Sequence, residues 1–211
     1  APKTKPGAFS RQQLLDDARE LARILEETHP DPYTKGGGRI AFHRRLHQAL
    51  NAIPDEGMTK DEFFRLMRPF VAGVADAHTN FLHGYGVDAS RPRGVPLRLK
   101  VVEESLVVVG IERPNQELLG SRRLSVERLP LAELVARQRR LQGIDNQYHA
   151  LHVLATRSLV YKAYLQDLVP EWTDTARVRV ELLGPDGRVA AIELKQPGKE
   201  PAEVKPPSRV S

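Results

Sequence analysis

The hydrophobic pattern changes at about residue 88, and this change constrains the fold more than any other feature. Before it, apolar residues recur at the spacing of amphipathic helices; after it, short runs alternate between polar and apolar residues, as half-buried strands do. The spacing of the apolar residues decides which side chains share a face, so a helical pattern does not suit a half-buried strand, and an alternating pattern does not suit a helix. The sequence therefore predicts an α+β chain, with a helical domain over residues 1–87 and a strand-rich domain over residues 88–197.

The first part is expected to hold three helices. Ser10 with Gln13, and Thr59 with Glu62, have the spacing of a capping box at a helix start. The first of these helices should end before Pro30, because a proline disfavours the α region in the residue before it. A further helix between them carries its apolar residues over 42–50. Three helices of this size can pack into a small bundle.

The second part is expected to be mainly strands with helices inserted. Strands are predicted at 97–101, 106–111 and 124–126, and a hairpin at 184–187 joins two more, 178–182 and 189–194. One helix should begin at Pro130 and another should run from about 148 to 168. Residues 198–211 are rich in proline and have the composition of a linker-like tail.

Composition excludes several classes of protein. The chain has no cysteine, so disulfides, zinc ribbons and cysteine nucleophiles are absent. The net charge of +5 is spread thinly instead of lying on one basic element, so nucleic-acid binding is not predicted. The longest apolar run is about six residues, too short for a membrane span. His43 and His47 lie one helical turn apart but have no third ligand in view, so we predict no metal and no cofactor.

Candidate chemistry concentrates in the run Asp76-Ala77-His78-Thr79, after the third predicted helix. His78 there could act as a general base whose tautomer is fixed by a neighbour. The alternative is that His78 and Asp76 only cap the helix end, where an imidazole suits the helix dipole. The sequence contains no G-x-S-x-G elbow, phosphate loop or dinucleotide fingerprint.

Several stretches together resemble the front part of the C-terminal processing (tail-specific) serine peptidases, in the branch related to the tricorn protease core. They are EETHP at 26–30, TKDEF at 59–63, DAHT at 76–79, VPL at 95–97 and GSRRLSVERLP at 120–130. In the last stretch Glu127 and Arg128 stand where the family has an Asn-Gly turn. The resemblance covers about residues 10–195.

The resemblance implies a helical domain followed by a PDZ-like domain with inserted helices. It implies that His78 is the general base, with Asp76 and Thr79 as positioning neighbours. The family's nucleophilic serine and oxyanion hole belong to a peptidase domain, which is expected C-terminal to residue 211. A base without its nucleophile cannot run an acyl-enzyme cycle, so this chain alone should be inactive.

A PDZ-like module also implies peptides or unfolded protein C-termini as partners, with a carboxylate held by backbone N–H groups before the first strand. Gly94, Val95, Leu97 and Arg98 are the peptide-binding candidates. In the parent protein the module is expected to guide the substrate, or else only to brace the peptidase domain. The alternative functions are a stand-alone PDZ-like peptide-binding or scaffold protein, and a structural adaptor with neither role. The start at Ala1, without Met, fits removal of a signal peptide or a trimmed chain; with the resemblance, it predicts a periplasmic or secreted protein.

Overall fold

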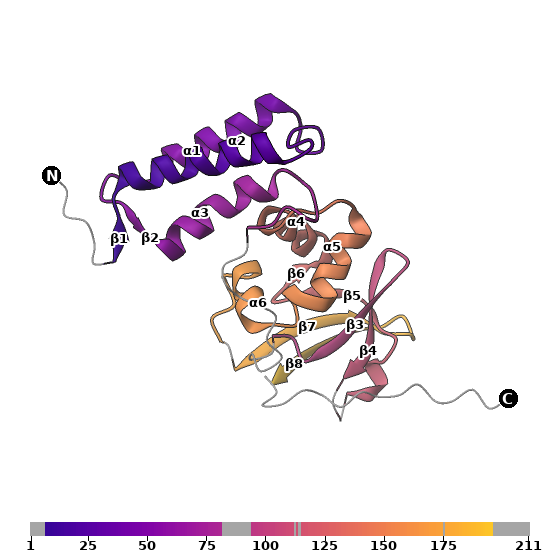
Figure 1. Cartoon of the computed structure of the whole chain (residues 1–211). Coiled ribbons are helices and arrows are strands. Elements are labelled where there is room, and N and C mark those ends of the chain that lie inside the picture. The colour runs from indigo at the N-terminus through magenta and orange to yellow at the C-terminus, as the bar shows by residue number, and fades with distance from the viewer. Residues whose placement is uncertain (1–6, 82–93, 112, 114, 175, 196–211) are drawn as a thin grey trace. The chain divides into compact units, whose positions relative to one another are not determined.

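The computed structural model describes residues 7–81, 94–111, 113, 115–174 and 176–195 (Figure 1). It is 45% helical and 22% strand, with small antiparallel sheets, which confirms the α+β class. The chain divides into two compact units: residues 1–86 with 139–145, and residues 87–138 with 146–211. The predicted tail, 198–211, lies outside the described residues. In the described part of the chain, no helix is long and apolar enough to cross a membrane.

Three helices make up most of what the structure describes of the first unit: α1 (Arg11–Thr28), α2 (Arg39–Asn51) and α3 (Lys60–Ala72). Two short antiparallel strands, β1 (Ala8–Phe9) and β2 (Met58–Thr59), pair ahead of α1 and α3. All three helices bury apolar side chains in one shared core, which comprises Ala18, Ala22, Leu25, Phe42, Ala49, Met67, Phe70, Val71 and Val74.

Both predicted capping boxes are confirmed. Ser10 donates its backbone N–H to Gln13 Oε1 over 3.0 Å, while its hydroxyl oxygen accepts the N–H of Gln13. Thr59 and Glu62 form the same reciprocal pair at the start of α3, with 2.7 Å between Thr59 N and Glu62 Oε2. Each pair satisfies N–H groups that a helix start leaves without partners, and such a cap stabilises a helix by about 1 kcal/mol.

The described residues of the second unit form two antiparallel sheets. β3 (Leu97–Val102) pairs with β4 (Ser105–Ile111), and a four-stranded sheet has the order β6-β5-β7-β8. Its strands are β5 (Arg122–Val126), β6 (Leu129–Pro130), β7 (Arg177–Leu183) and β8 (Val189–Lys195). The predicted hairpin over 184–187 is confirmed, because β7 and β8 pair directly across it. Along β7, alternate residues are buried, which gives the sheet one core face.

The helices of this unit are α4 (Leu131–Leu141), α5 (Gln147–Val153) and α6 (Lys162–Leu168), with a 3-10 turn η1 (Gln116–Leu118) and a π-helix η2 (Leu154–Ser158). The last three residues of α4 belong to the first unit. The prediction of one helix from about 148 to 168 is wrong. The chain leaves the helix at 159–161, where the carbonyls of Leu159 and Val160 accept the N–H groups of Val95 and Gly94, each over 2.7 Å.

Candidate active site

The candidate site is built on the turn from Asp76 to Thr79, which follows α3 within the first unit. The turn closes through the N–H of Thr79, which donates to the carbonyl of Asp76 over 3.1 Å. Ala75, just before it, has a φ of 60°, in the left-handed region that costs a residue with a side chain about 1 kcal/mol. Backbone strain of this kind persists where surrounding contacts hold the chain in place, and such places are often functional.

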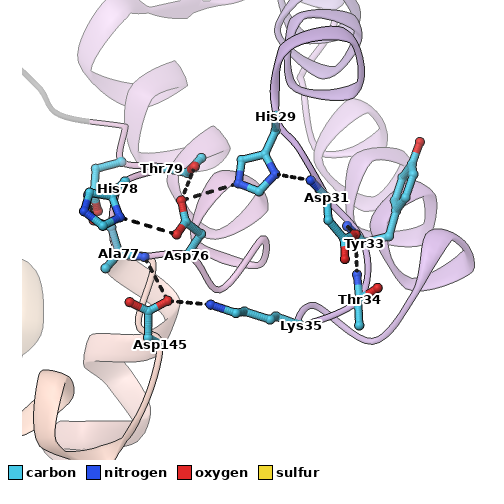
Figure 2. A network of polar contacts seen from close by, with 11 residues as sticks. His29, Asp31, Tyr33, Thr34, Lys35, Asp76, Ala77, His78, Thr79 and Asp145 are labelled. Atoms are coloured by element: carbon cyan, nitrogen blue, oxygen red, sulfur yellow. Dashed lines mark hydrogen bonds and ion pairs between the residues drawn. The ribbon is translucent and has the colours of Figure 1, made fainter.

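The Asp76 carboxylate is the centre of a polar network (Figure 2). Its Oδ2 accepts the Thr79 hydroxyl over 2.7 Å and lies 3.4 Å from His29 Nε2. Its Oδ1 lies 3.7 Å from His78 Nδ1, an ion-pair distance that is longer than a hydrogen bond. The structure therefore brings together the three residues predicted for this site, His78, Asp76 and Thr79, and adds His29 from the end of α1.

Two opposing effects act on the pKa of Asp76. Partial burial raises the pKa, and hydrogen bonds from the Thr79 hydroxyl, the His29 ring and the His78 backbone N–H lower it. The hydrogen bonds outweigh the burial, so the pKa of Asp76 lies below its ordinary value. Asp76 is thus a carboxylate at neutral pH, held in place by donors on more than one side.

A cavity of about 680 Å³ lies against this network and is lined by the end of α1, the loop after it and the Asp76–Thr79 turn. The two histidines at Asp76 differ sharply in exposure: the His29 side chain is 15% exposed, whereas that of His78 is 94% exposed. The His78 ring is therefore open to a reactant, and the His29 ring is part of the wall.

The turn is supported by residues that precede α5. Asp145 Oδ1 accepts the N–H of Ala77 over 3.3 Å and the ammonium of Lys35 over 2.8 Å (Figure 2). This contact raises the pKa of Lys35 and lowers that of Asp145. Gly143 packs so closely on the turn that a Cβ there would lie 2.1 Å from the Asp76 carbonyl oxygen. Gly143 and Asp145 were not predicted for the site, because they lie more than sixty residues after the Asp76–Thr79 turn and carry no local motif.

Of the described residues that line the cavity, two carry hydroxyl groups, and neither is placed as a nucleophile. The Thr28 hydroxyl donates to the Ile24 carbonyl over 2.7 Å, and the Thr79 hydroxyl donates to Asp76. Among the residues the structure describes, no three His, Asp or Glu side chains are grouped to hold a metal ion. The arrangement can therefore orient an imidazole and accept a proton, and neither hydroxyl of the described cavity lining is placed to act as a nucleophile.

The four peptide-binding candidates lie in the second unit. Gly94, Val95 and Leu97 are buried, and Arg98 is exposed on β3. The N–H groups of Gly94 and Val95, which were expected to hold a carboxylate, already donate to the carbonyls of Val160 and Leu159. A peptide carboxylate would have to displace those carbonyls in order to bind there.

No family model matches this sequence, and no curated protein matches it. Solved structures do match in fold. The chain is similar to CPAF, a chlamydial serine protease of the tail-specific type. Against a mutant of CPAF the TM-score is 0.58 at 15% identity, over 88% of this chain and 34% of that one.

Two further CPAF structures give the same result. Against CPAF complexed with lactacystin the TM-score is 0.53 at 14% identity, and against mature CPAF it is 0.50 at 15%; each match covers 88% of this chain and 34% of the other. The chain thus spans about a third of the length of the CPAF chains it matches. At such identities the likeness is one of fold, and the fold is related to that of a protease.

Proposed function

We propose that this chain is the N-terminal, non-catalytic part of a serine-type peptidase and that it supplies the general base, His78. The observation that carries the proposal is the geometry at Asp76. An ionised carboxylate faces Nδ1 of an imidazole whose ring is almost fully exposed at the edge of a cavity. Support comes also from the sequence resemblance and from the protease-related fold.

The proposed chemistry follows from this geometry. With its Nδ1–H directed to Asp76, His78 presents the lone pair of Nε2 to solvent. That nitrogen takes the proton of a serine hydroxyl as the serine oxygen attacks a peptide carbonyl, and it later returns the proton to the leaving amine. The nearby carboxylate stabilises the imidazolium formed between these steps. The serine and the oxyanion hole would come from a peptidase domain C-terminal to residue 211.

The second unit is proposed to be PDZ-like, with a domain boundary near residue 88. Because the N–H groups of Gly94 and Val95 are already bonded within the unit, a bracing role fits it better than capture of a peptide carboxylate. Isothermal titration with peptides that carry free or amidated C-termini tests this directly. We expect no difference between the two peptides. Tighter binding of the free carboxylate would favour the stand-alone peptide-binding protein instead.

The general-base assignment is tested by His78→Ala in the protein that joins this chain to its peptidase domain. We expect kcat to fall by about 100- to 10,000-fold, the usual contribution of general acid–base catalysis, with little change in thermal stability because the side chain is exposed. His47→Ala is the matched control, a histidine on α2 that does not line the cavity. Near-normal turnover by His78→Ala would refute the assignment.

The origin of the nucleophile has its own test. A fluorophosphonate probe, which labels activated serines, should not label the 211-residue chain by itself. It should label a serine outside the chain in the joined protein, and more slowly when His78 is alanine. Labelling within the 211 residues would contradict the proposed division of the site between this chain and another domain.

A further inference from the structure

The His29 ring is held on both of its nitrogens. Its Nδ1 lies 3.0 Å from the backbone nitrogen of Asp31, which can only donate, so Nδ1 is the acceptor. The ring proton of the neutral imidazole is therefore on Nε2, which faces Asp76 Oδ2 over 3.4 Å (Figure 2). The His29 backbone is held as well, because its N–H caps α1 by donating to the Leu25 carbonyl. His29 thus has one tautomer and one orientation.

This arrangement divides the two oxygens of Asp76 between two histidines. Oδ2 receives two donors, His29 Nε2–H and the Thr79 hydroxyl. These two donors, together with the His78 backbone N–H that also bonds to the carboxylate, hold Asp76 with Oδ1 at 3.7 Å from His78 Nδ1. At 3.7 Å this contact is electrostatic and is not a hydrogen bond. A carboxylate so close to one ring nitrogen favours the tautomer that carries its proton there, and the other nitrogen then keeps the lone pair.

We propose that His29 is a positioning residue: it anchors the Asp76 carboxylate so that His78 carries its proton on Nδ1 and keeps Nε2 free to accept one. The catalytic meaning of this role rests on the proposed function, in which Nε2 of His78 is the base. His29 cannot itself be that base in this arrangement, since Nδ1 is occupied by the Asp31 N–H and Nε2 bears the proton. The role resembles that of outer groups that orient a functional histidine through the contact at its other nitrogen.

The prediction is specific because an unconstrained histidine in water favours the opposite tautomer, with the proton on Nε2. Imidazole nitrogen NMR on the full 211-residue chain near neutral pH distinguishes the two forms. We expect His29 to be the Nε2–H tautomer and His78 to be mainly the Nδ1–H tautomer. Because the side chain of His78 is 94% exposed, nothing but the carboxylate contact holds it in that form among the contacts described for it.

Substitutions at His29 then test cause and effect. His29→Phe keeps a flat ring but removes the donor, and we expect His78 to revert to mainly Nε2–H and the pKa of Asp76 to rise. His29→Gln restores a donating nitrogen at a similar reach. It should partly restore both the Nδ1–H tautomer of His78 and the low pKa of Asp76. The matched control is His43→Phe, which removes another histidine–carboxylate contact of the same unit, 3.2 Å from Glu26, without touching Asp76. It should change neither signal.

Each outcome is decisive for His29. If His29→Phe keeps the fold by circular dichroism and leaves the His78 tautomer unchanged, the proposal is overturned. If His29→Phe unfolds the unit, the unaltered protein and His29→Gln decide it. A His78 ring that is mainly Nδ1–H in the unaltered protein and keeps part of that form in folded His29→Gln supports the role, and a His78 ring that is mainly Nε2–H in the unaltered protein refutes it. None of these measurements uses peptidase activity. A failed His78→Ala turnover test therefore removes the proposed function and leaves the positioning result standing.

Discussion

Gly143 offers the most direct test of how the candidate site is held together. An ideal Cβ at Gly143 would lie 2.1 Å from the carbonyl oxygen of Asp76 and 2.9 Å from that of Thr79. Both atoms are backbone atoms of the turn that carries His78, so neither can rotate away. The shorter distance falls about 1 Å inside an ordinary carbon–oxygen contact, and overpacking of this kind costs about 1–3 kcal/mol.

Gly143→Ala should therefore cost the first unit about 2–3 kcal/mol of unfolding free energy, or move the turn by about 1 Å. A shift of that size would also break the bond from the Ala77 N–H to Asp145, which is already 3.3 Å long. Urea unfolding followed by far-ultraviolet circular dichroism measures the first effect, because this unit is mainly helical. Fluorescence would not, since the single tryptophan, Trp172, lies in the other unit. Amide hydrogen exchange at Thr79 measures the second effect.

Gly184→Ala is the matched control. A Cβ there would meet Asp186 Oδ1 at 2.7 Å, but that atom ends a side chain that can turn aside, so the cost should stay below about 1 kcal/mol. The reasoning would be refuted if Gly143→Ala unfolded within about 0.5 kcal/mol of the unaltered protein and Thr79 exchanged at its normal rate. Such a result would mean that the turn is soft and that the glycine is not a structural requirement.

Two further predictions concern the same unit. The Arg45 guanidinium donates to the carbonyls of Gly36 (2.7 Å) and Gly73 (2.8 Å), which ties the loop after α1 to the end of α3. Arg45→Met should therefore lower the free energy of unfolding in urea by about 2–3 kcal/mol, and Arg45→Lys, which can reach one carbonyl, by less. Equal stability of all three proteins would contradict this role. The lowered pKa of Asp76 means that its stabilising contribution is present above the unfolded pKa and is lost as pH falls through the folded pKa. Asp76→Asn should therefore flatten the acid limb of the stability–pH curve, and an unchanged slope would show that the carboxylate adds no stability.

The sequence predicted best those features that depend on neighbouring residues. Both capping boxes are confirmed because each needs only two side chains three positions apart. The hairpin at 184–187 is confirmed because its turn residues are neighbours in the sequence. The helix expected from 148 to 168 failed because its break depends on Gly94 and Val95, more than sixty residues earlier, whose N–H groups draw the carbonyls of 159 and 160 out of the helix.

At the turn of Glu127 and Arg128, contacts with a residue distant in the sequence outweigh the local backbone preference of the turn residues. Neither residue favours the left-handed region, yet both have a positive φ, 49° and 67°, between β5 and β6. Glu127 compensates by bonding to Arg179 on β7 twice: its N–H donates to the Arg179 carbonyl over 2.9 Å, and its carboxylate accepts the Arg179 N–H over 2.6 Å. The strain is thus offset by a partner that no local pattern identifies.

The same distinction applies to the candidate site. A run of four residues drew attention to Asp76 and His78, but the sequence alone left open whether they were a helix cap or a base with its partner. What separates these readings is the environment of the carboxylate, and it comes from far along the chain: His29 lies 47 residues before Asp76, and Asp145 lies 68 residues after Ala77. A simple helix cap needs neither residue. An Asp76 carboxylate that contacts a partly buried histidine and an exposed one suits general-base chemistry. The tautomers of the two rings test how the carboxylate positions His78, and the turnover of His78→Ala decides between the cap and the base.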